Sequence, residues 1–148
     1  MKKFRLVFQL GKTLFFFVIL ASIGVTQGCN DDDDDIDPLQ TRLAELTGTW
    51  QLGSVLNDAN DVSDQFQGFM LTLNADKTFF TTNGGNAWPA TGSFDFVDDN
   101  INQILRSDDI AITIADVTTN SLQLTFMQNA ITGRTQGITG SFSFSLIK

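Results

Sequence analysis

The feature that most restricts the fold of this chain is an alternation of apolar and polar residues with a period of two. It is clearest near the C-terminus, where Phe142, Phe144 and Leu146 alternate with serines. Successive side chains of a β-strand point to opposite faces of a sheet, so the pattern predicts a strand with one buried face. The same alternation recurs through residues 49–147, which predicts an all-β domain built from an antiparallel sheet.

The alternating segments are numerous enough to close a barrel. We expect eight strands, at residues 49–57, 68–74, 78–83, 90–97, 101–106, 109–117, 121–128 and 137–147. Their short spacing is typical of an up-and-down meander, and eight such strands can close into a barrel without exposed edges. Ahead of them, Asp37-Pro38 is a typical helix start and leucines recur at helical spacing, so we expect a short helix at 38–46.

The links between the expected strands differ in length. Those at residues 74–77, 98–100 and 118–120 are short and rich in turn residues, and in an up-and-down barrel they lie at the same end as the helix. The opposite end receives the longer links at 58–67, 83–89 and 129–136, together with one short link at Ser107-Asp108. We therefore expect one closed end and one end covered by longer loops.

The first 28 residues resemble an export signal rather than part of a folded domain. A basic start is followed by an apolar run at 14–25, which is short for a membrane span, and Gly28 precedes the only cysteine. The stretch Thr26-Gln27-Gly28-Cys29 resembles the lipobox of bacterial lipoproteins. The resemblance implies a signal peptide at 1–28, cleavage before Cys29, and attachment of acyl chains such as palmitate to Cys29. An ordinary secretory signal with an incidental cysteine is the alternative.

Residues 29–37 predict an acidic tether between this anchor and the domain at 38–148. Asp31–Asp35 are five adjacent carboxylates that repel one another, so we expect an extended, disordered segment. From Asn30 to Asp37 it can span about 25–30 Å. An acidic run after a lipidated cysteine resembles the signal that sends some lipoproteins to the cell surface. We expect an outer-membrane anchor at that surface, with the periplasmic face as the alternative.

The charge and the residue types exclude several functions. Residues 29–148 hold five Lys or Arg and all seventeen Asp or Glu, a net charge of −12, so phosphates of nucleic acids would be repelled. One cysteine and no histidine exclude an internal disulfide, an imidazole-assisted nucleophile and a His-ligated zinc. The pairs Asp98-Asp99 and Asp108-Asp109 fall in expected turns with no apolar setting, so we expect no enzyme, metal or cofactor.

A short motif at the start of the first strand carries a family resemblance. Gly48-Thr49-Trp50 resembles the Gly-X-Trp motif of lipocalins, and the frame at 46–52 with 71–79 looks like the lipocalin-like domains of bacterial lipoproteins. By pattern the resemblance covers 46–148, and it implies that Gly48 and Trp50 lie at the closed end of the barrel. Lipocalins stack an arginine from the last strand on this tryptophan. Here Lys148 stands near that position, and a lysine does not stack as a guanidinium plane does.

Two functions stay open at this point. An eight-stranded barrel can hold one small ligand or can be filled by its own side chains. In the first case the chain binds a small hydrophobic ligand, with Trp88 at the mouth of the cavity. In the second, a filled barrel contacts a protein or glycan through Trp88 and the Asp58–Asp64 loop. We expect a monomer in both cases. The candidate cavity residues are Phe69, Leu71, Phe94, Phe96, Ile112, Leu124, Phe126, Phe142 and Phe144.

Overall fold

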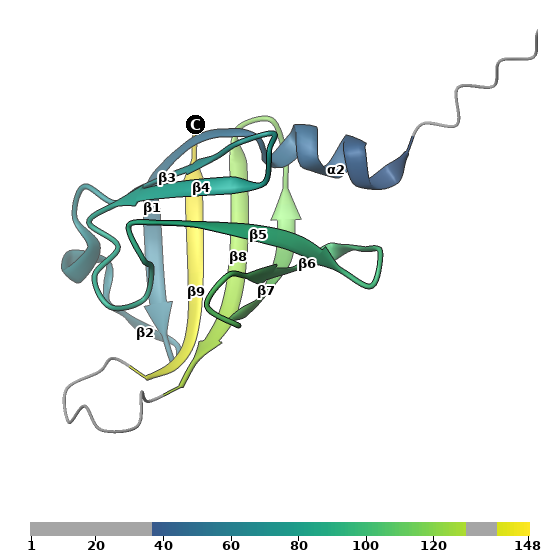
Figure 1. Cartoon of the computed structure of the whole chain (residues 1–148). Coiled ribbons are helices and arrows are strands. Elements are labelled where there is room, and N and C mark those ends of the chain that lie inside the picture. The colour runs from purple at the N-terminus through teal and green to yellow at the C-terminus, as the bar shows by residue number, and fades with distance from the viewer. Residues whose placement is uncertain (1–36, 130–138) are drawn as a thin grey trace, which may run out of the picture. The chain divides into compact units, whose positions relative to one another are not determined.

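The computed structural model describes residues 37–129 and 139–148. The expected signal peptide, Cys29, the acidic run and most of the 129–136 link lie outside the described residues. The described part forms a closed antiparallel barrel of eight strands with a short α-helix at one end (Figure 1). None of its helices is long and apolar enough to cross a membrane.

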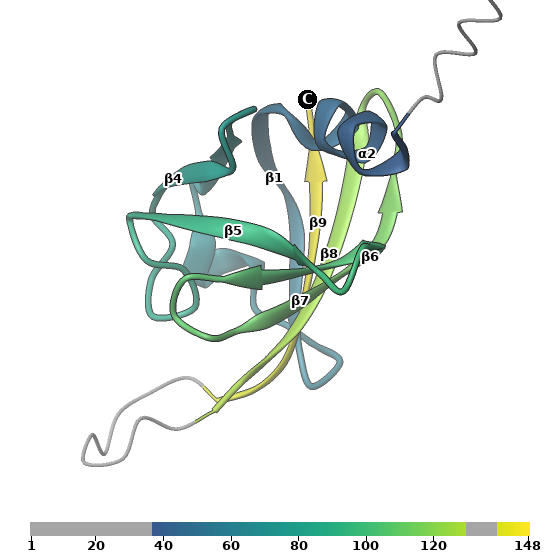
Figure 2. The same cartoon turned by 45° about the vertical axis from the view of Figure 1, so that its right-hand side comes forward.

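The barrel strands follow one another around the sheet in sequence order, which confirms the expected meander. Their bounds agree with the expected strands to within about three residues. The barrel closes because the first strand pairs with the last, from Gln51↔Ile147 to Asn57↔Phe142 (Figure 2). The eight strands are β1 (Gly48–Asn57), β3 (Met70–Leu73), β4 (Thr78–Thr82), β5 (Thr91–Val97), β6 (Asn100–Arg106), β7 (Ala111–Val117), β8 (Ser121–Gln128) and β9 (Gly140–Ile147).

The helix α2 (Pro38–Leu46) has the expected bounds and its start has a clear cause. The Asp37 carboxylate accepts a hydrogen bond from the Leu39 N–H at 2.9 Å, and Pro38 occupies the first turn, where no N–H is needed. Leu43 and Leu46 are buried against the barrel. On its other side, Arg42 Nη2 donates to the Asn102 side chain of β6 at 3.1 Å. The helix therefore lies at the end of the barrel that carries the short turns.

The 58–67 link is more ordered than a plain loop. Asp58 and Ala59 both have positive φ, 47° and 66°, and form a two-residue turn that folds β2 (Asn60–Asp61) back onto β1. A 3-10 helix, η2 (Ser63–Phe66), follows and carries Phe66 into the core, where its side chain is 1% exposed. The sequence contained no alternation over these few residues, so neither element was expected.

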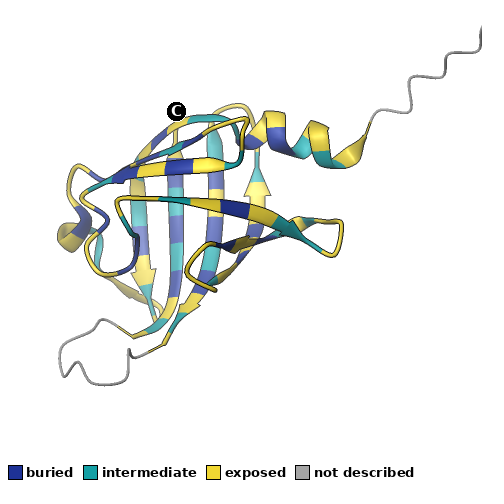
Figure 3. Ribbon diagram, viewed as in Figure 1, coloured by how far each residue is buried: buried dark blue, intermediate teal, exposed yellow. Residues whose placement is uncertain are grey.

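The core lies inside the barrel. Buried and exposed residues alternate along the strands, as Figure 3 shows. In β9, Phe142, Phe144 and Leu146 are at most 1% exposed, whereas the serines between them lie on the outer face. The alternation in the sequence thus corresponds to an apolar interior and a polar exterior.

Candidate functional site

The candidate cavity residues all lie on the inner side of the barrel or at its margin. Eight of the nine are at most 4% exposed and belong to one apolar cluster. Phe96 is only half-buried and packs against the edge of that cluster. The structure therefore brings the predicted set together, and the next question is how much space remains between these side chains.

Aromatic rings occupy the interior toward the end with longer loops. Seven of them form a connected network in which neighbouring ring centroids are 5.2–6.2 Å apart. These separations are those of directly packed edge-to-face and offset rings. The rings belong to Phe66, Phe69, Phe79, Trp88, Phe126, Phe142 and Phe144.

Trp88 does not lie exposed at a mouth. Its side chain is 4% exposed, and its ring is 5.8 Å from that of Phe79 on β4 and 5.6 Å from that of Phe126 on β8. Because β4 and β8 are four strands apart in a barrel of eight, the indole bridges opposite walls. The expectation that Trp88 offers a contact surface is wrong, since burial of this large apolar ring stabilises a loop folded inward.

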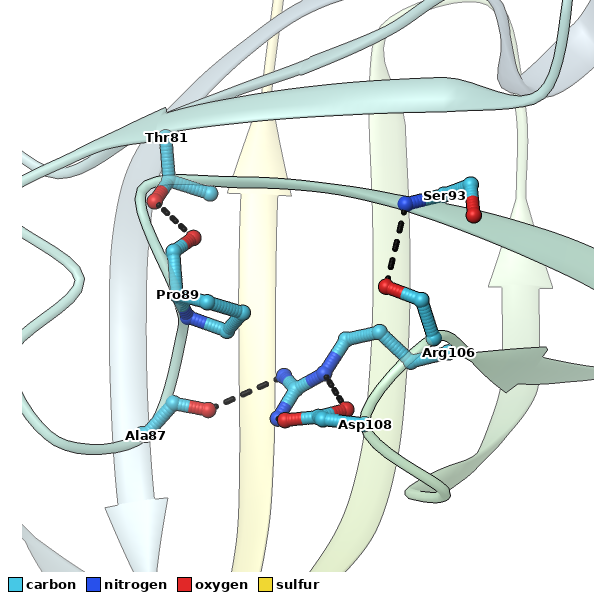
Figure 4. Close-up of polar contacts among 7 residues, drawn as sticks. Thr81, Ala87, Pro89, Ser93, Arg106 and Asp108 are labelled. Carbon is cyan, nitrogen blue, oxygen red and sulfur yellow. Dashed lines mark hydrogen bonds and ion pairs between the residues drawn. The ribbon is translucent and has the colours of Figure 1, made fainter.

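Specific contacts hold the Trp88 loop, residues 84–89, in this inward position (Figure 4). Thr81 Oγ1 donates to the Pro89 carbonyl at 2.8 Å, and Arg106 Nη1 donates to the Ala87 carbonyl at 2.9 Å. The loop also needs a glycine, because a Cβ at Gly84 would lie 2.6 Å from the Trp88 carbonyl oxygen. Strand side chains and a tight backbone approach therefore fix the loop on both sides of the indole.

Arg106 is the main residue that sequence reasoning missed. Its side chain is buried, its guanidinium carbon lies 4.8 Å from the Trp88 ring centroid, and its Nε and Nη2 each donate to the Asp108 carboxylate at 2.7 Å. The period-two rule offered a signal, because Ile104 is buried two residues earlier on β6. A buried guanidinium needs such a partner to offset the loss of hydration.

The Asp108 carboxyl responds to this pairing. Partial burial raises its pKa, but the hydrogen bonds and positive charge of Arg106 outweigh that effect, so the pKa lies below its ordinary value. The carboxylate therefore stays ionised at neutral pH. In contrast, the indole N–H of Trp88 has no hydrogen-bond partner among the described residues, although it is buried.

The closed end contains the residues that the lipocalin resemblance implied. Trp50 is fully buried, and its Nε1 donates to the Leu46 carbonyl at 2.8 Å. Lys148 Nζ lies 4.1 Å from the centroid of the Trp50 ring and donates to the Thr47 carbonyl at 3.2 Å. Gly48 makes this approach feasible, because a Cβ there would lie 3.0 Å from the Lys148 side chain. Lys148 thus lies against the Trp50 ring, where the lipocalin resemblance implied an arginine.

Two open hollows lie near the surface and differ in character from the aromatic interior. One of about 400 Å³ separates α2 from the turn after β7. Another of about 420 Å³ lies over β5 and β6, beside the ion pair between Lys77 and Asp95 at 2.6 Å. The hydrogen bond from Lys77 lowers the pKa of the Asp95 carboxyl. Charged groups at its edge make this second hollow a poor site for an apolar ligand.

Comparison with the models of known protein families and with curated proteins gives no match. Within residues 37–129 and 139–148, no three Cys, Asp or Glu side chains are grouped as a metal site would require.

Proposed function

We propose that this chain is a lipid-anchored protein of the cell envelope with a lipocalin-like barrel filled by its own side chains. In this proposal the barrel is a non-enzymatic interaction module that contacts a protein or glycan through its loops and outer surface. The anchor is the acylated Cys29, in the outer membrane and facing the cell exterior, with the periplasmic face as the alternative. The acidic tether separates the module from the lipid.

The position of Trp88 carries the filled-barrel part of the proposal. A ligand inside the barrel would have to occupy the space between β4 and β8, where the indole contacts Phe79 and Phe126. Displacing it would also break the hydrogen bonds that hold Ala87 and Pro89. Breaking either hydrogen bond would leave a buried polar group without a partner, which opposes replacement of the indole by a ligand.

Of the two predicted contact regions, Trp88 and Asp58–Asp64, the second stays exposed, and it is acidic rather than aromatic. Asp58 and Asp61 are exposed. Hydrogen bonds from the Ser63 hydroxyl and N–H lower the pKa of Asp61, which keeps this carboxylate ionised. A partner docking here would therefore meet negative charge and hydrogen-bond acceptors.

Binding of a small hydrophobic ligand is the second candidate, and one observation favours it. The buried Trp88 N–H lacks an acceptor among the described residues. An acceptor oxygen on a ligand would satisfy it, since buried donors are normally hydrogen-bonded. Such a ligand would have to enter with the Trp88 loop rearranged.

Native mass spectrometry of protein purified from its own cell envelope separates the two candidates. The filled barrel predicts the mass of the acylated chain alone. A stoichiometric small molecule that is released by unfolding would contradict it and support the second candidate.

Fractionation of Cys29→Ser tests the anchor, because the variant should move from the membrane to the soluble fraction. An unchanged membrane fraction would reject lipid attachment at Cys29.

A further inference from the structure

More than half of the barrel circumference carries no charged side chain. The neighbouring strands β8, β9, β1, β3 and β4 contain no Asp, Glu, Lys or Arg, although residues 29–148 have a net charge of −12. We call the outer surface of these five strands the uncharged wall. Its outward residues are mostly Ser, Thr and Gln.

The uncharged wall also exposes large apolar side chains. Ile147, Gln51 and Met70 lie side by side in register across β9, β1 and β3, and Ile147 and Met70 are 50% and 39% exposed. Phe80 on β4 is 48% exposed and pairs with Thr72, next to Met70 along β3. A second apolar pair, Leu56 and Met127, lies nearer the other end. Exposed apolar groups gathered on one face often mark an interaction site.

Carboxylates are concentrated at the two ends of the barrel. Within the described residues they occupy turns, loops and the short elements α2, β2 and η2, as at Asp58, Asp76 and Asp98-Asp99, whereas the barrel strands outside the wall add only Asp95 and Asp116. Negatively charged lipid headgroups would repel the ends of the molecule. The uncharged wall is thus the broadest face that can approach a lipid surface without this repulsion.

A lipid attached to Cys29, as proposed above, would place a membrane within reach of this face. Cys29 precedes the N-cap residue Asp37 by eight positions, which at about 3.5 Å per residue keeps the module within roughly 28 Å of an attached lipid. Such tethering raises the local concentration of the surface, so a weak contact becomes populated. We propose that the uncharged wall docks on the membrane to which the chain is anchored, with Phe80, Met70 and Ile147 entering the headgroup region. This inference rests on the proposed lipid anchor.

Fluorescence quenching by brominated lipids tests the docking. The mature chain, residues 29–148, is coupled through the Cys29 thiol to a maleimide lipid in phosphatidylcholine vesicles with dibrominated acyl chains. The native Trp50 and Trp88 are buried, so an exposed reporter dominates the change. We expect Phe80→Trp to be quenched at least threefold more than Leu105→Trp. The control position on β6 is similarly exposed, at 42%, and lies four strands from β1 in both directions.

An isosteric charge provides the matched pair of variants. Gln51→Glu places a carboxylate in the middle of the Ile147–Met70 row, and in vesicles with added phosphatidylglycerol it should lower quenching of the Phe80→Trp reporter about twofold. Gln103→Glu adds the same charge on β6 and should leave quenching of the Phe80→Trp reporter unchanged.

Equal quenching of the Phe80→Trp and Leu105→Trp reporters, or no quenching of either, would overturn the proposal. So would a dimer of the uncoupled chain in sedimentation that Phe80→Ser abolishes, because the wall would then bind a second copy. Chemical coupling makes these results independent of acylation in the cell, which the Cys29→Ser fractionation tests.

Discussion

The two ends of the barrel use the same arrangement of a buried tryptophan and a cation. At the closed end Lys148 Nζ is 4.1 Å from the Trp50 ring, and toward the other end the Arg106 guanidinium is 4.8 Å from the Trp88 ring. Both rings are at most 4% exposed. Each tryptophan therefore closes the interior toward one end of the barrel, and each has a cation over its ring.

The two arrangements differ in how their polar groups are satisfied. Trp50 donates to Leu46, only four residues away, and its lysine remains at the surface. Trp88 has no acceptor among the described residues, and its arginine is buried and depends on Asp108. At the closed end the Trp50 N–H is thus satisfied within one short segment, between the helix and β1. The other end is assembled around a buried charge, so we expect it to be the more sensitive to loss of a whole side chain or of the partner of that charge.

Trp88→Ala should have the largest effect. Removing a buried tryptophan from the centre of the aromatic network should lower the free energy of unfolding by about 3–5 kcal/mol. Urea denaturation measures this change. The space left between β4 and β8 should bind xenon or benzene, which a filled wild-type barrel should not. A loss below about 1 kcal/mol would show that Trp88 does not fill the interior.

Asp108→Asn should come second. It leaves Arg106 buried without its ion pair, at a cost of about 2 kcal/mol, less than for a fully buried pair because Asp108 is 43% exposed. Adding Arg106→Met to it should recover part of the stability, and denaturation of the single and double variants measures the difference. If the double variant is no more stable than Asp108→Asn, the charge is not the source of the loss.

The ion pair between Arg106 and Asp108 also makes the stability of the fold depend on pH at the acid end. The pKa of Asp108 is lowered on folding, so its stabilising effect is present above the ordinary value of 3.8 and is lost as the pH falls through the lowered pKa. Stability measured from pH 5 downward should therefore fall less steeply in Asp108→Asn than in the wild type. If stability falls equally steeply with pH in both proteins, Asp108 is not the carboxylate responsible.

Matched Trp→Phe substitutions compare the two ends directly. Trp50→Phe removes the donor to the Leu46 carbonyl, whereas Trp88→Phe removes an N–H that has no partner among the described residues. The closed end should lose about 1 kcal/mol more than the other end, which is the worth of one buried hydrogen bond. Thermal unfolding of both variants measures the difference, and the opposite order would indicate that the Trp88 N–H is bonded after all.

Lys148→Ala should have the smallest effect, about 0.5–1 kcal/mol, because an exposed cation over a ring contributes little. Lys148→Arg should retain or exceed wild-type stability, since a guanidinium can stack on the Trp50 indole. Chemical denaturation at low and high salt checks both. A neutral Lys148→Ala would mean that the ammonium does not stabilise the closed end.

The sequence predicted the parts of the fold that depend on local pattern. Alternation placed all eight barrel strands, and Asp37-Pro38 placed α2, because these signals arise from residues adjacent in the chain. The position of Trp88 was not predictable in this way. Its burial depends on Phe79, Phe126 and Arg106, which approach it only when the barrel closes. Loop residues at Gly84 and Gly85 indicated a turn but not its direction.

The pairing of β1 with β9 also has a kinetic consequence. Gln51 pairs with Ile147, so the contact that closes the barrel joins residues almost at the two extremes of the folded domain. Such high contact order slows folding, because the chain must lose much of its freedom before this pairing stabilises it. A nascent chain emerging in order cannot complete the barrel until its final strand is available. Until then the apolar side chains of β1 and β8 that β9 covers in the closed barrel remain exposed.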